Sequence, residues 1–357
     1  MNYILNKAFY ALLTLFGVVT VIFFLFNVLP GDPAQMMLGQ NEDSAQLAIV
    51  KQKYGFDKPI STQYAYYLND LSPLSFHSNR TEDYTYLSKG KYSAVQLFSV
   101  GNTTIVLKFP YLRESFTKQG KKVTQVIAET LPNTIVLAVS AITIAIIIGI
   151  LLGIVSALFK DQWLDKVIQI FSTLGMSLPS FFSAILFAWF FGFVLHEYTN
   201  LEMTGSLYEL DDFGESMHIK WKNLILPAIV LGIRPLAVVI QLMRNSLLEV
   251  FNQDFIRTAR AKGLSEFQII KRHAVKNALN PVVTAISGWF ASMLAGAVFV
   301  EYIFGWNGLG KEIVNALNTL DLPVIMGSVL IIALTFIIIN IFVDVIYAWL
   351  DPKVKLR

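Results

Sequence analysis

The strongest constraint on the fold is a set of six long apolar segments. A helix needs roughly 20 apolar residues to cross a bilayer, and each segment is about that long or longer. Of the 357 residues, 55% are hydrophobic and 15% charged, which is more apolar surface than one soluble core could bury. We therefore predict an all-α polytopic membrane protein with six transmembrane helices, at residues 8–29, 133–159, 167–195, 224–243, 282–300 and 324–349.

Composition argues against several classes of protein. The chain has no cysteine and only four histidines, which are scattered, so we predict neither a disulfide framework nor a metal site. A membrane-embedded enzyme would need a nucleophile with a base or a metal cluster, and the spans supply neither, so we predict no catalytic residues. An ion-coupled carrier should show inverted repeats and intramembrane acids, whereas Asp344 is essentially the only acid here.

The first apolar segment has two interpretations. Lys7 precedes it, as in a secretory signal peptide. The run is, however, longer than an ordinary signal-peptide core, and it ends at residues 29–33 without a small-residue cleavage site. We favour a retained N-terminal transmembrane helix over residues 1–29.

Lysine and arginine residues predict the orientation. Short segments at 160–166, 244–280 and 351–357 hold most of the short-loop basic residues, whereas 301–323 holds only Lys311. Because short basic loops stay in the cytoplasm, both termini and the tail 351–357 should be cytoplasmic. The segment 30–131 is long enough to be exported whatever its charge, so we predict an external domain between the first two helices.

This external segment changes character along its length. Residues 34–71 look helical, with a stop and turn at 54–59. Residues 95–100 and 103–109 alternate around Gly101-Asn102, which predicts a β-hairpin with a two-residue turn.

Two predicted helices carry small residues at every fourth position, which allows close backbone approach in lipid. Packing within this chain and contact with another subunit remain equally open interpretations of both stripes. The stripes are Ala141, Ala145, Gly149, Gly153 and Ala157 in the second span and Gly288, Ser292 and Gly296 in the fifth.

Two features mark a candidate pathway through the membrane. Pro179 should kink the third span, and Ser177, Ser180 and Ser183 could satisfy the carbonyl that it frees; the kink is either pathway-lining or purely structural. Arg234 lies near the middle of the fourth span, where a charge costs roughly 2.5 kcal/mol or more. It should face a wet cavity or a partner, and Asn340 and Asp344 are possible partners in a structural pairing.

Between the fourth and fifth spans lies a basic segment, 244–276, with seven lysines and arginines against Glu249, Asp254 and Glu266. Cytoplasmic retention alone would explain the charge. It does not explain the local pattern. Residues 254–262 look helical, Gly263 suits a left-handed C-terminal cap, and Ser265 with Gln268 forms a capping box. We predict two helices meeting at a tight corner, with Leu264 projecting from it.

This segment resembles one found in a known family, the permease subunits of type I ATP-binding-cassette importers of the dipeptide and oligopeptide type. The general family opening, glutamate-alanine-alanine, is Arg257-Thr258-Ala259 here, in agreement with the peptide-type branch. The resemblance covers nearly the whole chain except about 69–110, which looks like an insertion. The landmarks are 29–33, 131–134, 226–228, 244–250, 254–265, 273–281, 300–301, 308–310 and 350–352.

The resemblance implies a function for the corner and for the core, residues 132–350, that contains it. The corner would couple the chain to two cytoplasmic ATPase subunits, which hold ATP and Mg²⁺, so we expect no cofactor in this chain. A second, homologous permease, an external binding protein and the lipid bilayer complete the expected partners, and we expect no nucleic acid. The implied coupling residues are Asp254, Arg257, Thr258, Ala259, Arg260, Ala261, Lys262, Gly263, Leu264 and Ser265.

Pathway candidates are less sharply defined than the coupling residues: Ser177, Pro179, Ser180 and Arg234. The expected cargo is dipeptides or oligopeptides, imported across the cell inner membrane. The alternatives are the same architecture carrying nickel chelates or another small solute and, less favoured, an ion-coupled carrier.

Overall fold

The computed structural model describes residues 2–28, 34–35, 44–88, 90–211 and 216–350. The chain divides into two compact units: Met1–Glu129 with Asn315–Ala333, and Thr130–Val314 with Leu334–Arg357. Predictions for residues 29–33 and for the tail 351–357 lie outside the described residues.

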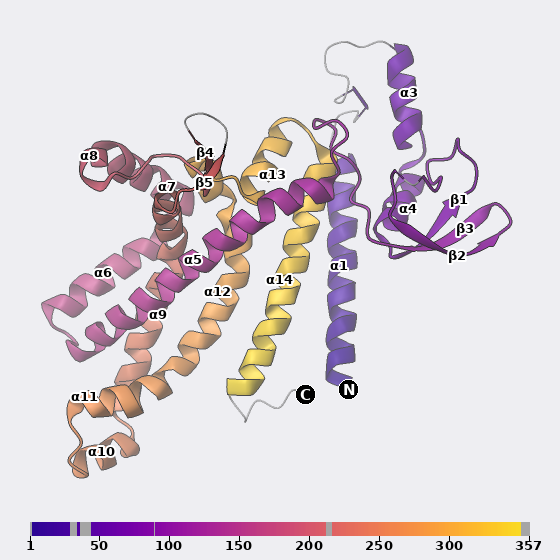
Figure 1. Ribbon diagram of the computed structural model, residues 1–357. Helices are drawn as coiled ribbons and strands as arrows, with labels where there is room; N and C mark the ends of the chain where they lie inside the picture. The colour runs from indigo at the N-terminus through magenta and orange to yellow at the C-terminus, as the bar shows by residue number, and fades with distance from the viewer. Residues whose placement is uncertain (1, 29–33, 36–43, 89, 212–215, 351–357) are drawn as a thin grey trace. The chain divides into compact units, whose positions relative to one another are not determined.

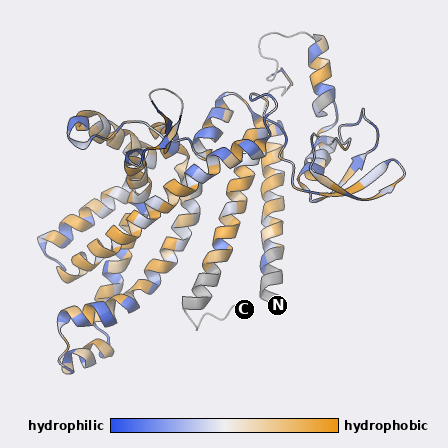
Figure 2. Cartoon of the chain, viewed as in Figure 1, coloured by the Kyte–Doolittle hydropathy of each residue, from blue (hydrophilic) through white to orange (hydrophobic). Residues whose placement is uncertain are grey.

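Long apolar helices dominate the described chain (Figures 1 and 2). By length and composition, four of the described helices can cross a membrane, or five if one sharply bent pair counts as a single span. The fifth predicted span, 282–300, lies in α12 (Val275–Phe304), which is not among them. The four are α1 (Asn2–Val28), α5 (Val123–Leu158), α9 (Lys222–Phe251) and α14 (Leu322–Leu350).

The bent pair shows that the kink predicted at Pro179 is a complete break. Helix α6 (Trp163–Ser177) and helix α7 (Ser180–Trp189), which continues as the π-helical turn η1 (Phe190–Val194), differ in direction by 112°. Pro179 disfavours helical geometry in the preceding residue, and Leu178 is extended with ψ 132°. The third predicted span, 167–195, is therefore not one continuous helix. A one-turn helix, α8 (His196–Thr199), follows it.

Within the first unit, the segment between α1 and α5 forms short helices and a small β-sheet. The helical prediction for 34–71 corresponds to α3 (Ser44–Tyr54) and α4 (Ile60–Leu71), with Gly55 at φ +71° in the turn between them. The predicted hairpin is confirmed as β2 (Ala94–Val100) and β3 (Thr103–Lys108). Strand β1 (Leu74–Ser78), which was not predicted, pairs with β3, giving the antiparallel order β1-β3-β2.

A buried carboxylate ties helix α4 to this sheet. Asp70 is 1% exposed and accepts hydrogen bonds from Tyr84 Oη at 2.8 Å, Tyr92 Oη at 2.9 Å and Arg113 Nε at 3.1 Å. Lys108 on β3 donates to the Asp70 backbone carbonyl. Burial lowers the pKa of Lys108 to about 8, because desolvation disfavours the ammonium form. The all-α description is therefore incomplete: this part of the chain is a small α/β layer.

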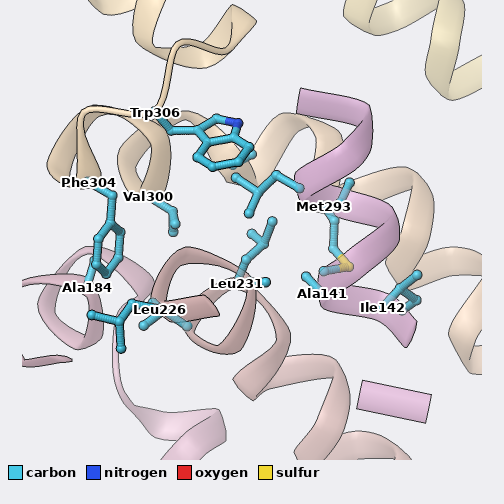
Figure 3. Packing of buried hydrophobic residues seen from close by; sticks show 14 of the residues in the cluster. Ala141, Ile142, Ala184, Leu226, Leu231, Met293, Val300, Phe304 and Trp306 are labelled. Carbon is cyan, nitrogen blue, oxygen red and sulfur yellow. The ribbon is translucent and has the colours of Figure 1, made fainter. Parts of the chain in front are cut away.

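In the second unit, α5 packs closely against α9. A Cβ atom on Gly149 would lie 2.7 Å from Val239 Cγ1, and one on Gly153 would lie 2.6 Å from Met243 Cβ. The small-residue stripe of the second span therefore serves packing within this chain. Figure 3 shows the apolar cluster that contains Leu231 and Trp306. The indole N–H of Trp306 donates to the backbone carbonyl of Asn133 at 3.0 Å.

Two further elements complete this unit. Strands β4 (Tyr208–Leu210) and β5 (Met217–Ile219) form an antiparallel pair that was not predicted from the sequence. Helix α13 (Leu309–Asn318) follows α12. The backbone N–H groups of Gly310 and Lys311, in the first turn of α13, donate to the buried carboxylate of Glu301 at 2.6 and 3.1 Å. The carboxylate thereby satisfies amide groups that a helix N-terminus leaves unpaired.

Candidate functional site

The predicted corner is present at residues 254–269. Helix α10 (Asp254–Ala261) is capped at its C-terminus by Lys262, Gly263 follows, and α11 (Glu266–Ile269) begins after its N-cap Ser265. The π-helical turn η2 (Ile270–Ala274) then leads into α12. In Figure 2 this segment is much more hydrophilic than the long helices on either side of it.

Backbone hydrogen bonds explain why the corner is tight. Gly263 has φ +78°, its N–H donates to Arg260 O at 2.9 Å, and Leu264 N–H donates to Ala259 O at 3.4 Å. This pair of bonds with a left-handed residue is the Schellman arrangement that ends helices. Ser265 then accepts from Gln268 N–H and donates its own N–H to the Gln268 side chain, so the predicted capping box is confirmed.

Leu264 differs from the prediction that it projects from the corner. It is half-buried and packs on a cluster that includes Ala259. A hydrophobic contact between these two positions commonly accompanies the Schellman arrangement, which accounts for the change. The exposed apolar side chains are instead Phe255, 42% exposed, and Phe267, 71% exposed.

The corner is fixed to the membrane helices by a buried face. Ile256 of α10 and Ile269 of α11 are completely buried, and they share a cluster with Met243 and Leu247 of α9. Burying side chains of this size contributes about 1.5–3 kcal/mol each. Helices α9 and α10 should therefore move together when a force acts on the exposed face.

Charged and polar side chains cover that exposed face. Arg260 donates to Glu266 at 3.0 Å across the corner, and Arg257 donates to Asp254 at 3.4 Å along α10. These exposed pairs add little stability, since surface ion pairs are worth about 0–1 kcal/mol. Thr258 donates its hydroxyl to the Asp254 carbonyl, while Ala261 and Lys262 are simply exposed. The exposed face of the corner therefore combines two aromatic rings with ion-paired side chains and the exposed Lys262.

A buried ion pair beside the corner was not predicted from the sequence. Asp165 Oδ2 lies 2.6 Å from Arg244 Nη2, and Asp165 Oδ1 accepts from Arg244 Nε at 2.8 Å. Ser156 and the backbone N–H of Asp161 also donate to this carboxylate. The pair fastens the α5–α6 turn to the end of α9, next to the corner.

The predicted pathway residues lie in one region, but they are not all together. Ser180 and Arg234 line a cavity of about 260 Å³ in the second unit. Ser177 instead donates its hydroxyl to Thr173 O on its own helix, and Pro179 forms the N-terminal boundary of α7. Of the two proposed partners of Arg234, Asn340 donates to Phe336 O, and the Asp344 side chain lies outside the described part of the chain.

The chain is similar to known transport proteins along nearly its whole length. Residues 145–356 match the family of binding-protein-dependent transport system inner membrane components, and residues 1–82 match the N-terminal family of the same systems. The chain is 31% identical to the dipeptide transport system permease protein DppB of Alkalihalophilus pseudofirmus, over 99% of both proteins. It is 29% identical to the glutathione transport system permease protein GsiC of Salmonella choleraesuis, over 100% of both.

Solved structures show a similar fold. A chain of the inward-facing MetNI methionine ABC transporter aligns with a TM-score of 0.50 at 15% identity. The alignment covers 64% of this chain and 98% of that one.

Proposed function

The chain belongs to the family of binding-protein-dependent transport system inner membrane components, and from this premise we propose that it is the membrane permease of an ATP-driven importer of short peptides. The corner at 254–269 carries the proposal, because an exposed surface held rigidly on membrane helices suits a docking site for a soluble motor. Relatives named for dipeptide and glutathione transport support a peptide cargo. The fold shared with the MetNI chain supports an importer architecture.

ATP would act on this chain only through its partners. We infer that two cytoplasmic ATPase subunits bind the α10–α11 corner and that an external binding protein delivers the peptide. Closure of the ATPase pair on ATP would pull α10, and the buried contacts of Ile256 with α9 would pass that movement to the spans. Hydrolysis would reset the arrangement. The chain itself performs no chemistry, and ATP and Mg²⁺ reside in the partners.

A second permease subunit fits the small-residue stripe of α12. A Cβ atom on Gly288 would have no neighbour within 4 Å among the residues that the structure describes. Ser292 lines a cavity within this chain, and the surroundings of Gly296 lie outside the described part. In contrast to the stripe of α5, Gly288 is left open by the described part of this chain, as an interface for a similar subunit requires. Six spans, cytoplasmic termini and an external segment 30–131 complete the proposed arrangement.

A single cysteine at Ser265 should report docking and orientation together, because the natural chain has no cysteine. We expect a bifunctional thiol reagent to link it to an ATPase subunit, and an impermeant thiol reagent outside intact cells to leave it unlabelled. A cysteine at the exposed Thr103 should behave in the opposite way; Thr104, which is 2% exposed, is unsuitable. External labelling of Ser265→Cys would reverse the orientation and remove the docking proposal.

Gly263→Val should uncouple the ATPases from transport. Apart from Gly263 and its chain neighbours, no described residue has an atom within 4 Å of the position of a Cβ, so the substitution costs backbone strain alone, about 1–2 kcal/mol for a left-handed residue and more for a β-branched one. We expect normal insertion but reduced stimulation of ATP hydrolysis by the loaded binding protein. Gly263→Asn is the matched control, because asparagine tolerates this conformation. Equal stimulation in the two variants would show that the corner geometry is unimportant.

A further inference from the structure

A cavity in the second unit is lined by one charged residue and several serines. Its lining comes from α6, α7, α9 and α12, and it includes Arg234 together with Ser180, Ser183 and Ser292. Trp289 and Leu231 supply apolar wall. At about 260 Å³ it is too small for a whole oligopeptide but large enough for one end of a peptide.

Arg234 has no partner within the described part of the chain. It makes no hydrogen bond, ion pair or ring contact there, and it is the thirteenth residue of the 30-residue helix α9, near the middle of the span. An unpaired charge at that depth is costly in lipid, and such residues face water, a partner or a ligand. An anionic group entering the cavity would offset the cost.

Other groups in the cavity also favour an anion. Ser180 and Ser183 hydroxyls make no hydrogen bond to any residue that the structure describes, so both can donate to a ligand. Ser180 begins α7, and no side chain caps the first amides of that helix. Unpaired first-turn amides carry partial positive charge. Arginine adds a planar fork of donors that matches the two oxygens of a carboxylate.

The anion that every unmodified linear peptide carries is its C-terminal carboxylate. We propose that Arg234, Ser180 and Ser183 form a carboxylate subsite in the membrane, which holds the C-terminus of the peptide during its passage. This inference rests on the proposed function and deepens it: the permease contributes its own selectivity for a free C-terminus, in addition to that of the binding protein.

The test compares a dipeptide with its C-terminal amide in vesicles that contain the whole complex. Dialanine and dialanine amide are supplied at concentrations that load the binding protein equally, so that differences in uptake arise in the membrane. For the wild type, we expect the free dipeptide to be taken up about tenfold faster than the amide, as the loss of charge-assisted hydrogen bonds would predict.

Variants of this chain assign the selectivity to the subsite. Arg234→Gln should lower dialanine uptake about tenfold and leave the uptake of the amide unchanged. Arg234→Lys should restore part of the preference, since it keeps the charge but loses the fork. Lys222→Gln is the control, because it removes an exposed positive charge from the start of the same helix, outside the cavity.

Each outcome decides a separate point. If Arg234→Gln lowers both uptakes equally, or changes neither in an assembled complex, the subsite is wrong while the importer stands. If the wild-type complex moves no peptide with ATP, the proposed function fails and the subsite fails with it.

Discussion

Asp165→Leu is expected to lower the free energy of unfolding of the solubilised protein by about 3 kcal/mol, the lower end of the cost of breaking a buried ion pair, because it leaves a partly buried guanidinium without its partner. Asp165 is 4% exposed at its side chain and Arg244 is 18% exposed, so water cannot fully replace the lost contacts. The change can be measured as a shift in the denaturation midpoint. Since the pair holds the end of α9 next to the corner, stimulation of the ATPases should fall as well.

Asp161→Asn is the matched control for this prediction. It removes an exposed acidic group from the same turn, while the backbone N–H that donates to Asp165 stays in place. We expect it to change stability by less than about 0.5 kcal/mol. The double variant Asp165→Leu/Arg244→Leu should be less destabilised than the sum of the two single variants. If Asp165→Leu is as stable as Asp161→Asn, the ion pair does not hold this turn.

Gly310→Ala is expected to disturb the junction of α12 and α13. Its Cβ would lie 2.5 Å from Val298 Cα and 2.8 Å from Glu301 Oε2, and the backbone atom cannot move aside as a flexible side chain can. Overpacking of this kind costs about 1–3 kcal/mol, and here it also displaces the carboxylate that caps α13. The buried Trp306 nearby makes intrinsic fluorescence a suitable measurement of unfolding.

Gly17→Ala provides the comparison for Gly310→Ala. Outside the local backbone of α1, no described residue has an atom within 4 Å of a Cβ at this position, so alanine should be neutral or slightly stabilising there. Equal stability of Gly310→Ala and Gly17→Ala would contradict the close approach around Gly310.

Local features of the fold were predictable because their causes are local. The end of α10 at Gly263 and the start of α11 at Ser265 follow from a left-handed residue and a capping box only a few positions apart. The hairpin around Gly101 follows from alternation and a two-residue turn. Long helices follow from apolar length alone, although the four that can cross a membrane each begin before the predicted span.

Long-range pairings were not predictable in the same way. Asp165 and Arg244 are 79 positions apart, and no spacing rule relates them. The network around Asp70 likewise joins α4 to residues up to 43 positions away. Pro179 predicted a kink in the third span. Whether a proline kinks a helix or breaks it depends on what the neighbouring residues pack against. The sequence did identify Arg234 and Ser180 as pathway candidates, whereas their placement in one cavity with Ser183 required the three-dimensional structure.

ATP-dependent accumulation of a labelled dipeptide is the most direct measurement of the central claim. The chain is reconstituted in vesicles with a second permease, two ATPases and the binding protein, and uptake is followed with ATP, without ATP and with a non-hydrolysable analogue. We predict that the dipeptide accumulates against its gradient only with ATP and loaded binding protein. Accumulation of a nickel chelate in place of any peptide would contradict the peptide cargo. No effect of ATP on any solute in an intact complex would contradict the importer itself.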